Sequence, residues 1–141
     1  YFRKEMTPEC PFPFLTMQLP SGRKLFYADP GTTEDDRITY KEWDYGHWSE
    51  SETYGGKLTE NLTQAVGRDC LAFALDNLRR ANYRVVFHVH DEVVIEYPSR
   101  HTADTEWALQ NVIDIMGIVP PWAQGLPLNA AGWYGDFFTK D

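Results

Sequence analysis

The sequence has 141 residues, 43% of them hydrophobic and 15% aromatic, which is typical of one folded domain able to bury a core. No apolar run approaches the roughly 18 residues of a membrane span, and no signal peptide opens the chain. The net charge of −8 argues against a nucleic-acid partner. Its distribution weakens that argument, because eight acids lie between Asp29 and Glu52, whereas five bases and three acids lie between Lys57 and His90.

Residues 1–56 are predicted to form an extended N-terminal segment followed by a pair of strands. Four prolines within the first 20 residues exclude a long helix there. Strands are expected at Arg23–Tyr27 and Ile38–Trp43, separated by a break at Asp29–Gly31 and an acidic loop. The tract Asp44–Gly56 contains three glycines and is expected to be a connection.

A long helix is predicted from Lys57 to Asn82. Apolar residues recur on one helical face, no proline interrupts the segment, and Leu71–Leu75 consists of good helix formers. A second row of side chains, all able to donate hydrogen bonds, follows at steps of four, three and four: Lys57, Asn61, Gln64 and Arg68. This row is either a solvated face or a ladder of donors that faces a nucleic-acid groove or backbone.

The segment 84–97 is rich in β-branched and aromatic residues and is longer than the usual strand of ~5–6 residues. It is therefore predicted to form two strands, Arg84–Val89 and Glu92–Tyr97, with His90 and Asp91 at the bend. Length and charge indicate the bend, because no glycine or asparagine marks a hairpin turn there. A carboxylate at such a tip is a hard oxygen ligand that suits Mg²⁺, which fits phosphoryl or nucleotidyl transfer by a two-metal mechanism.

Two histidines beside this bend allow a different interpretation. His88 and His90 stand two residues apart, so on a continuous strand their imidazoles would share one face and could bind zinc. A third protein ligand would have to be His47 or His101, the only other histidines. A histidine packed in the core is the preferred interpretation of His88.

A second helix is predicted from Thr102 to Met116, with Gly117 as its stop and Thr102 or Ser99 as its cap. Residues 120–141 form a C-terminal tail in which Leu126–Tyr134 is expected to be a short strand.

The two cysteines, Cys10 and Cys70, are expected to be reduced thiols, since the chain has no secretory features. The glycosylation pattern at residues 61–63 is discounted because it falls in the predicted long helix.

Several segments together resemble a known family. The run Val89–Val93, with the sequence Val-His-Asp-Glu-Val, resembles the palm motif of family A DNA polymerases, the DNA polymerase I family. Tyr54–Asp69 is similar to the palm helix just upstream of that motif. Leu19–Arg23, Gly125–Leu128 and Gly132-Trp133 are similar to the bacteriophage and prophage branch, and the order and spacing agree over nearly the whole chain.

The resemblance implies roles for the residues of the bend. Asp91 would be a metal-binding catalytic carboxylate and Glu92 an auxiliary one, while His90 would lie near the primer terminus. The cofactor implied is Mg²⁺, in a two-metal site completed by a carboxylate outside this chain.

The resemblance also implies DNA contacts from the long helix. Gln64 matches the glutamine that touches the DNA minor groove beside the new base pair, and Lys57 and Arg68 would be further contacts. Asn61 departs from the pattern, because in cellular members the corresponding asparagine precedes the glutamine by four residues rather than three.

The implied fold is α+β, with an antiparallel sheet that contains the metal-carboxylate hairpin and is covered on one face by the two helices, as in a polymerase palm subdomain. Residues 1–141 would form a single domain, the C-terminal palm portion. The other palm carboxylate, the nucleotide-gripping fingers helix and the thumb lie upstream in this family, and their motifs do not occur here. The chain is therefore expected to be part of a DNA-directed DNA polymerase and to be inactive by itself.

The expected partners are primer–template DNA, deoxynucleoside triphosphates and upstream polymerase domains, with no membrane, in the cytoplasm of a bacterial host of a phage or prophage. Because the chain begins with Tyr1, it is expected to be a piece of a longer protein. Rings exposed where missing domains would pack would favour self-association; the candidates are Trp43, Trp48, Trp107, Trp122 and Trp133. Two alternatives stay open: a non-catalytic DNA-binding remnant that keeps the polar row, and a zinc-dependent hydrolase using His88 and His90.

Overall fold

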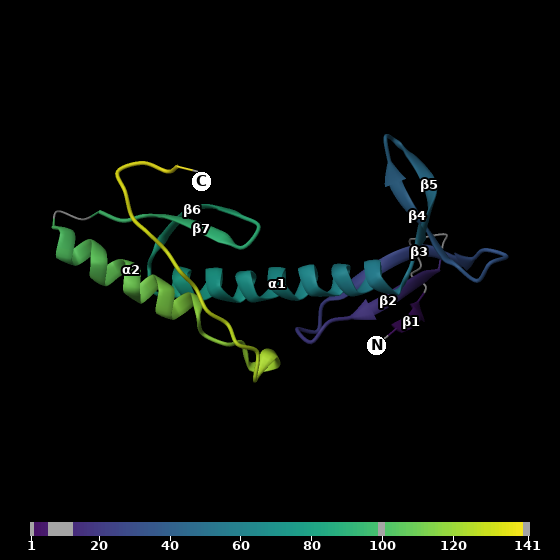
Figure 1. Ribbon diagram of the computed structural model, residues 1–141, viewed down its shortest axis with the longest axis horizontal. Coiled ribbons are helices and arrows are strands. Elements are labelled where there is room, and N and C mark those ends of the chain that lie inside the picture. Colours follow the sequence, from purple (N-terminus) through teal and green to yellow (C-terminus); the bar gives the residue numbers. More distant parts are fainter. Residues whose placement is uncertain (1, 6–12, 99–100, 140–141) are drawn as a thin grey trace. The chain divides into compact units, whose positions relative to one another are not determined.

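The computed structural model describes residues 2–5, 13–98 and 101–139, and its elements are those of an α+β protein with antiparallel strands and two α-helices (Figure 1). The chain divides into two compact units, Tyr1–Val66 and Gly67–Asp141. Helix α1 (Gly55–Arg80) contributes to both. The prediction that the whole chain forms one palm-type domain stays a prediction. Neither α-helix within the described residues has the length and apolar character that crossing a bilayer requires.

The first unit is built on a five-stranded antiparallel sheet in which each strand pairs with the next along the chain. The predicted strand pair is therefore only part of a larger meander. Its strands are β1 (Phe2–Glu5), β2 (Phe14–Gln18), β3 (Lys24–Thr32), β4 (Ile38–Asp44) and β5 (His47–Thr53).

Two strands of this sheet, β2 and β5, differ from the prediction. Strand β2 lies in the proline-rich N-terminal segment, because Pro13 precedes the strand rather than interrupting it. Strand β5 lies within the tract 44–56 that was expected to be a connection. It pairs with β4 along its whole length, from Ile38 opposite Thr53 to Asp44 opposite His47. Its hairpin turn, Tyr45-Gly46, has φ values of 43° and 85°, as a type I′ turn requires, although only the glycine signals this in the sequence. Residues 6–12, with Pro8 and Pro11, lie outside the described residues.

A small core joins this sheet to the start of α1. Met17 and Tyr27 of the sheet pack with Leu58 of α1, and all three are buried. The guanidinium of Arg23 donates a hydrogen bond to the backbone carbonyl of Ala65, 3.0 Å away, which ties the helix to the sheet. Partly buried apolar side chains surround this core: Leu15, Leu25, Ile38, Tyr40 and Leu62.

The second unit contains the remainder of α1, a β-hairpin, helix α2 (Thr102–Met116) and the short 3-10 helix η1 (Pro121–Ala123). The hairpin strands, β6 (Arg84–Val89) and β7 (Glu92–Glu96), form a two-stranded sheet of their own. The expectation of one antiparallel sheet that contains this hairpin is therefore wrong for the described residues. The physical reason is that β6 and β7 hydrogen-bond only with each other, while β1–β5 form a separate ladder.

The ends of the two helices differ in part from expectation. Helix α1 begins and ends two residues before the predicted bounds, whereas α2 has the predicted bounds. The residue before α2 is His101, which forms no capping side-chain hydrogen bond, so Thr102 is not a cap; Ser99 lies outside the described residues. Gly117 follows α2 as predicted, and its backbone N–H donates to the carbonyl of Ile113 at 3.0 Å.

The short strand expected at Leu126–Tyr134 is wrong, because this segment has no regular structure. A strand requires a partner ladder, and Pro127 removes one backbone donor from the segment. Trp133 and Tyr134 in this segment are half exposed, at 51% and 46%.

The core of the second unit depends on one face of α1. Leu71, Ala74 and Leu78 follow one another at helical spacing and are all buried, with Leu78 fully so, and Ala108 of α2 is also buried. The Tyr83 hydroxyl accepts a hydrogen bond of 2.7 Å from the side-chain amide of Asn111, which joins the start of the hairpin to α2.

Leu78→Ala should lower the free energy of unfolding by about 2–5 kcal/mol, because it removes buried methyl groups and leaves a cavity. Leu126→Ala is the matched control, since Leu126 is 38% exposed and the same atoms are deleted. Urea unfolding followed by circular dichroism measures both. Equal stability losses in the two variants would contradict the assignment of Leu78 to the core.

Cys70 is a free thiol on α1 whose pKa is raised, first by burial and second by the neighbouring charge of Asp69. A raised pKa means that the folded state favours the neutral Cys70 thiol. The contribution of this group to the free energy of unfolding is therefore fully present at lower pH and is lost as the pH rises through the folded-state pKa of Cys70. Cys10 lies outside the described residues. In a Cys10→Ser background, alkylation of Cys70 by iodoacetamide should therefore be slower in the folded chain than in urea, where the thiolate fraction is larger. Equal rates, followed by mass spectrometry, would contradict this environment.

Candidate metal and nucleic-acid site

The turn between β6 and β7 consists of two residues, His90 and Asp91, because Val89 pairs directly with Glu92. The bend predicted at these positions is therefore confirmed. His90 has a φ of 51°, in the left-handed region where histidine is enriched among non-glycine residues. This conformation closes the turn without glycine or asparagine. His90, Asp91 and Glu92 are all exposed.

A β-bulge in this hairpin sets the direction of the side chains near the turn. Val85 pairs with Ile95 and Phe87 with Val94, so Val86 is the extra residue. A bulge increases the local twist of the strands and redirects the side chains that follow it. This irregularity carried no glycine signal in the sequence.

Beyond the bulge, strand alternation assigns the side chains to two faces. Phe87, Val89 and Glu92 share one face, and His88 lies on the other. Phe87 packs edge-to-face against Phe138, with ring centroids 5.3 Å apart, so the C-terminal tail covers part of the Glu92 face. Asp91 stands at the end of the hairpin.

Asp91 and Glu92 can contribute only part of a metal site. Their carboxylates are hard oxygen donors at an exposed turn, which suits Mg²⁺. Within the part of the chain that the structure describes, no three His, Cys, Asp or Glu side chains are grouped to hold a metal ion. The hairpin fits a shared site in which substrate phosphates or another segment of protein complete the ligand set.

The structure does not support the zinc site predicted at His88 and His90. His90 lies in the turn rather than on the strand, so strand alternation does not align its imidazole with that of His88. His47 and His101 do not complete a group of three ligands among the residues described. His88 is exposed, so its expected place in the core is wrong.

The four side chains of the polar row on α1 differ in their exposure to solvent. Gln64 and Arg68 are exposed, and Lys57 is partly exposed. Asn61 is partly buried and donates a hydrogen bond of 3.2 Å to the hydroxyl of Tyr27 on β3. Asn61 thus connects α1 to the sheet in this structure. The DNA contacts predicted for this row stay predictions: Lys57, Asn61, Gln64 and Arg68.

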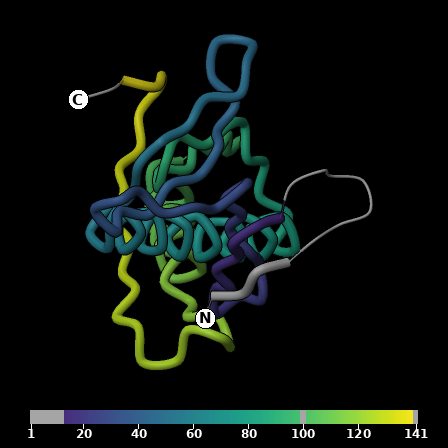
Figure 2. The backbone as a smooth tube through the Cα atoms, turned by 90° about the vertical axis from the view of Figure 1, so that its right-hand side faces the viewer, coloured from purple at the N-terminus to yellow at the C-terminus, as the bar shows by residue number. Residues whose placement is uncertain are grey.

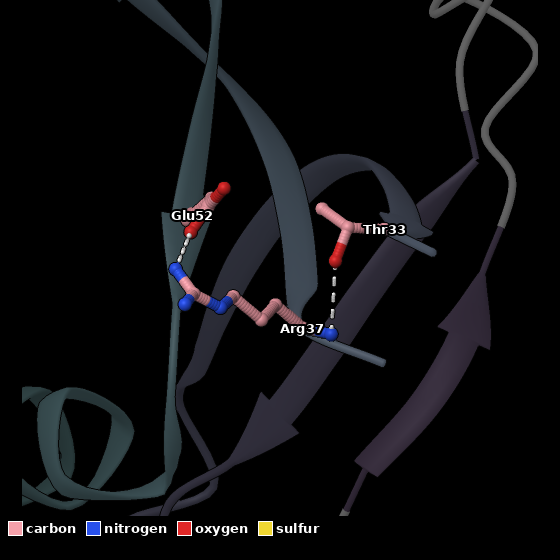
Figure 3. Close-up of polar contacts among 3 residues, drawn as sticks. All are labelled: Thr33, Arg37 and Glu52. Atoms are coloured by element: carbon pink, nitrogen blue, oxygen red, sulfur yellow. Dashed lines mark hydrogen bonds and ion pairs between the residues drawn. The ribbon is translucent and has the colours of Figure 1, made fainter. Parts of the chain in front are cut away.

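A hollow of about 630 Å³ in the first unit was not indicated by the sequence, since it combines residues from two separate segments. Arg37 is one of its lining residues. The Arg37 guanidinium lies 2.9 Å from the Glu52 carboxylate, and the Arg37 backbone N–H donates to the Thr33 hydroxyl at 3.1 Å (Figure 3). This exposed ion pair contributes about 1 kcal/mol or less. The lining residues are Asp36, Arg37, Ile38, Glu52, Thr53, Tyr54 and Gly55.

Comparison with known proteins found one informative relative. The chain is 45% identical over 133 residues to the DNA polymerase of Bacillus phage SP02. The chain is similar to part of a phage polymerase. The match covers 90% of this chain but 20% of that polymerase, so the chain spans about a fifth of its relative. No protein-family model matches the chain, and no solved structure matches it.

The matched segment is longer than either compact unit, so the similarity to the phage polymerase includes residues of both. It extends well beyond the few residues of the hairpin turn. The similarity therefore supports the interpretation of this chain as a polymerase segment more strongly than the turn motif does by itself.

Asn61→Ala and Tyr27→Phe should each lower the free energy of unfolding by about 0.5–1.5 kcal/mol, because each removes one partner of a part-buried hydrogen bond. The double variant should lose less than the sum of the two, as expected for residues in contact. Gln64→Ala, an exposed position on the same helix, is the control. Additive losses in urea unfolding would show that Asn61 and Tyr27 are not coupled.

Proposed function

We propose that this chain is the C-terminal palm portion of a family A DNA polymerase of phage type, and that Asp91 is one of its metal-binding carboxylates. The intact enzyme would transfer deoxynucleotides to a primer 3′-OH in a template-dependent reaction. The observation that carries the proposal is the 45% identity to a phage DNA polymerase over 133 residues. The exposed turn that presents Asp91 supports it.

In this proposal the hairpin holds the carboxylate in place. Strands β6 and β7 pair from Arg84 opposite Glu96 to Val89 opposite Glu92, so only two residues remain for the turn. This pairing restricts the backbone on both sides of Asp91. An ion pair of 2.9 Å between Arg84 and Glu96 closes the opposite end. When bound, Mg²⁺ would stabilise the negative charge on the attacking and leaving oxygens of the transfer.

Charge makes DNA binding at this turn dependent on cations. Asp91 and Glu92 are adjacent carboxylates on a chain with a net charge of −8, so they repel DNA phosphates through Coulomb interaction. Glu92 would act as the auxiliary carboxylate, and His90 would approach the primer terminus. Gln64 and Arg68, both exposed, would provide an amide donor for the minor groove and a cation for the phosphate backbone.

The same proposal implies that the isolated chain does not catalyse the reaction. A metal pair requires carboxylates from both palm motifs, and the triphosphate requires cationic groups of the fingers. The chain corresponds to 20% of its phage relative, and those other elements would belong to the rest of the polymerase. Its expected partners are therefore primer–template DNA, deoxynucleoside triphosphates and the remaining polymerase domains.

In the full-length parent protein, Asp91→Ala should abolish nucleotide incorporation and leave primer–template affinity within a few-fold of the wild type. Primer extension and fluorescence anisotropy measure these two properties. Asp35→Ala is the matched control, because it removes an exposed carboxylate from a loop of the first unit. With Fe²⁺ in place of Mg²⁺, added hydrogen peroxide and ascorbate should produce hydroxyl-radical cleavage near residue 91 in the control and not in Asp91→Ala, because peroxide oxidises the bound Fe²⁺ and ascorbate reduces it again.

Full incorporation by Asp91→Ala would overturn the metal-binding role. Robust primer extension by the isolated 141-residue chain would overturn its catalytic incompleteness. A parent protein that binds DNA through Gln64 and Arg68 but incorporates no nucleotide, even with Asp91 intact, would identify the chain as a DNA-binding remnant.

A further inference from the structure

Three aromatic side chains gather at the tip of the β4–β5 hairpin. Trp43 and Trp48 form a cross-strand pair, with ring centroids 5.5 Å apart and an interplanar angle of 76°. They are 62% and 48% exposed, and Tyr45 in the turn is 95% exposed. We call these three residues the tip cluster. The two views agree that this hairpin projects beyond the other strands of its sheet (Figures 1 and 2).

The backbone at Tyr45 does not favour a tyrosine. Its φ of 43° lies in the left-handed region, where a type I′ turn prefers asparagine or aspartate before the glycine. A side chain that is 95% exposed also contributes almost no packing to offset this cost. An aromatic residue held at an unfavourable, solvent-facing position is more readily explained by contact with a ligand than by folding.

The charges beside the tip cluster are mainly negative. Lys41 pairs with Glu50 across the strands, next to the tryptophan pair and on the same face. The Lys41 ammonium, however, lies 2.7 Å from the carboxylate of Asp29 on β3. Glu50 and Asp44 are both exposed.

This combination of aromatic rings and carboxylates excludes two common partners of exposed aromatic groups. Single-stranded nucleic acid binds where stacking rings line a positively charged groove, and the carboxylates of Asp44 and Glu50 repel phosphates. Membrane-surface segments combine aromatic rings with lysine and arginine to attract anionic lipids, and this tip has the opposite charge. A tryptophan face with a nearby carboxylate instead attracts a cationic side chain.

We propose that the tip cluster docks a cationic segment of another protein. An arginine or lysine side chain would lie over the ring of Trp43 or Trp48, and a neighbouring basic side chain would pair with Glu50 on the same face. Tyr45 would cover the segment from the turn. The tip is too small for a standard protein–protein interface, so the partner is a short peptide segment bound with modest affinity. This interaction is independent of the polymerase role.

The test uses the full 141-residue chain and a fluorescent peptide of arginine–serine repeats, with binding followed by anisotropy. Trp43→Ala and Trp48→Ala should each weaken binding by about two- to fivefold, the loss expected for one exposed cation–π contact. Glu50→Gln should weaken it and reduce its salt dependence. Trp133→Ala and Glu34→Gln are matched controls, since they remove an exposed ring from the second unit and one charge from the β3–β4 loop, respectively.

Tyr45→Asn separates binding from folding. This substitution suits the left-handed turn, so the melting temperature should stay the same or rise while peptide affinity falls. The proposal is overturned if the matched controls weaken binding as much as the tip variants. It is also overturned if a glutamate–serine peptide binds equally well, or if an oligothymidine binds more tightly than the arginine–serine peptide.

Discussion

The candidate site depends on the register of the β6–β7 ladder. Because Val89 pairs with Glu92, only His90 and Asp91 are left to reverse the chain, and His90 must adopt a left-handed conformation to do so. A shift of one residue would move Asp91 into a strand and exchange the faces of its neighbours. The bulge at Val86 and the contact of Phe87 with Phe138 belong to the same register. The position of one carboxylate thus follows from backbone hydrogen bonds rather than from its own contacts.

Different parts of helix α1 belong to the two compact units. Its first turns bury Leu58 against the five-stranded sheet and connect Asn61 to Tyr27, whereas its later turns bury Leu71, Ala74 and Leu78 in the second unit. Each unit therefore uses its own section of one amphipathic helix. This explains why a polar row that is regular in sequence is not uniform in environment: Asn61 is partly buried, and Gln64 is exposed.

The two proposed interactions depend on different local groups of charges. Carboxylates at the β6–β7 turn fit a metal-dependent contact with phosphates, while carboxylates beside exposed rings at the β4–β5 tip fit a cationic polypeptide. A net charge of −8 describes neither site by itself. What matters at each place is the set of groups within a few ångströms, because longer-range attraction is screened by salt.

The long helix, helix α2 and the bend at His90 and Asp91 could be predicted from the amino-acid order, because helical periodicity and β-branched runs are local signals. The amino-acid order also carried the similarity to a phage polymerase. Three features became known from the folded chain: His47–Thr53 is a strand, Leu126–Tyr134 is not, and the β6–β7 hairpin forms a sheet of its own. The tertiary structure also placed His88 in solvent and Asn61 against Tyr27. These outcomes depend on which distant segments hydrogen-bond or pack together, and local residue preferences do not specify that choice.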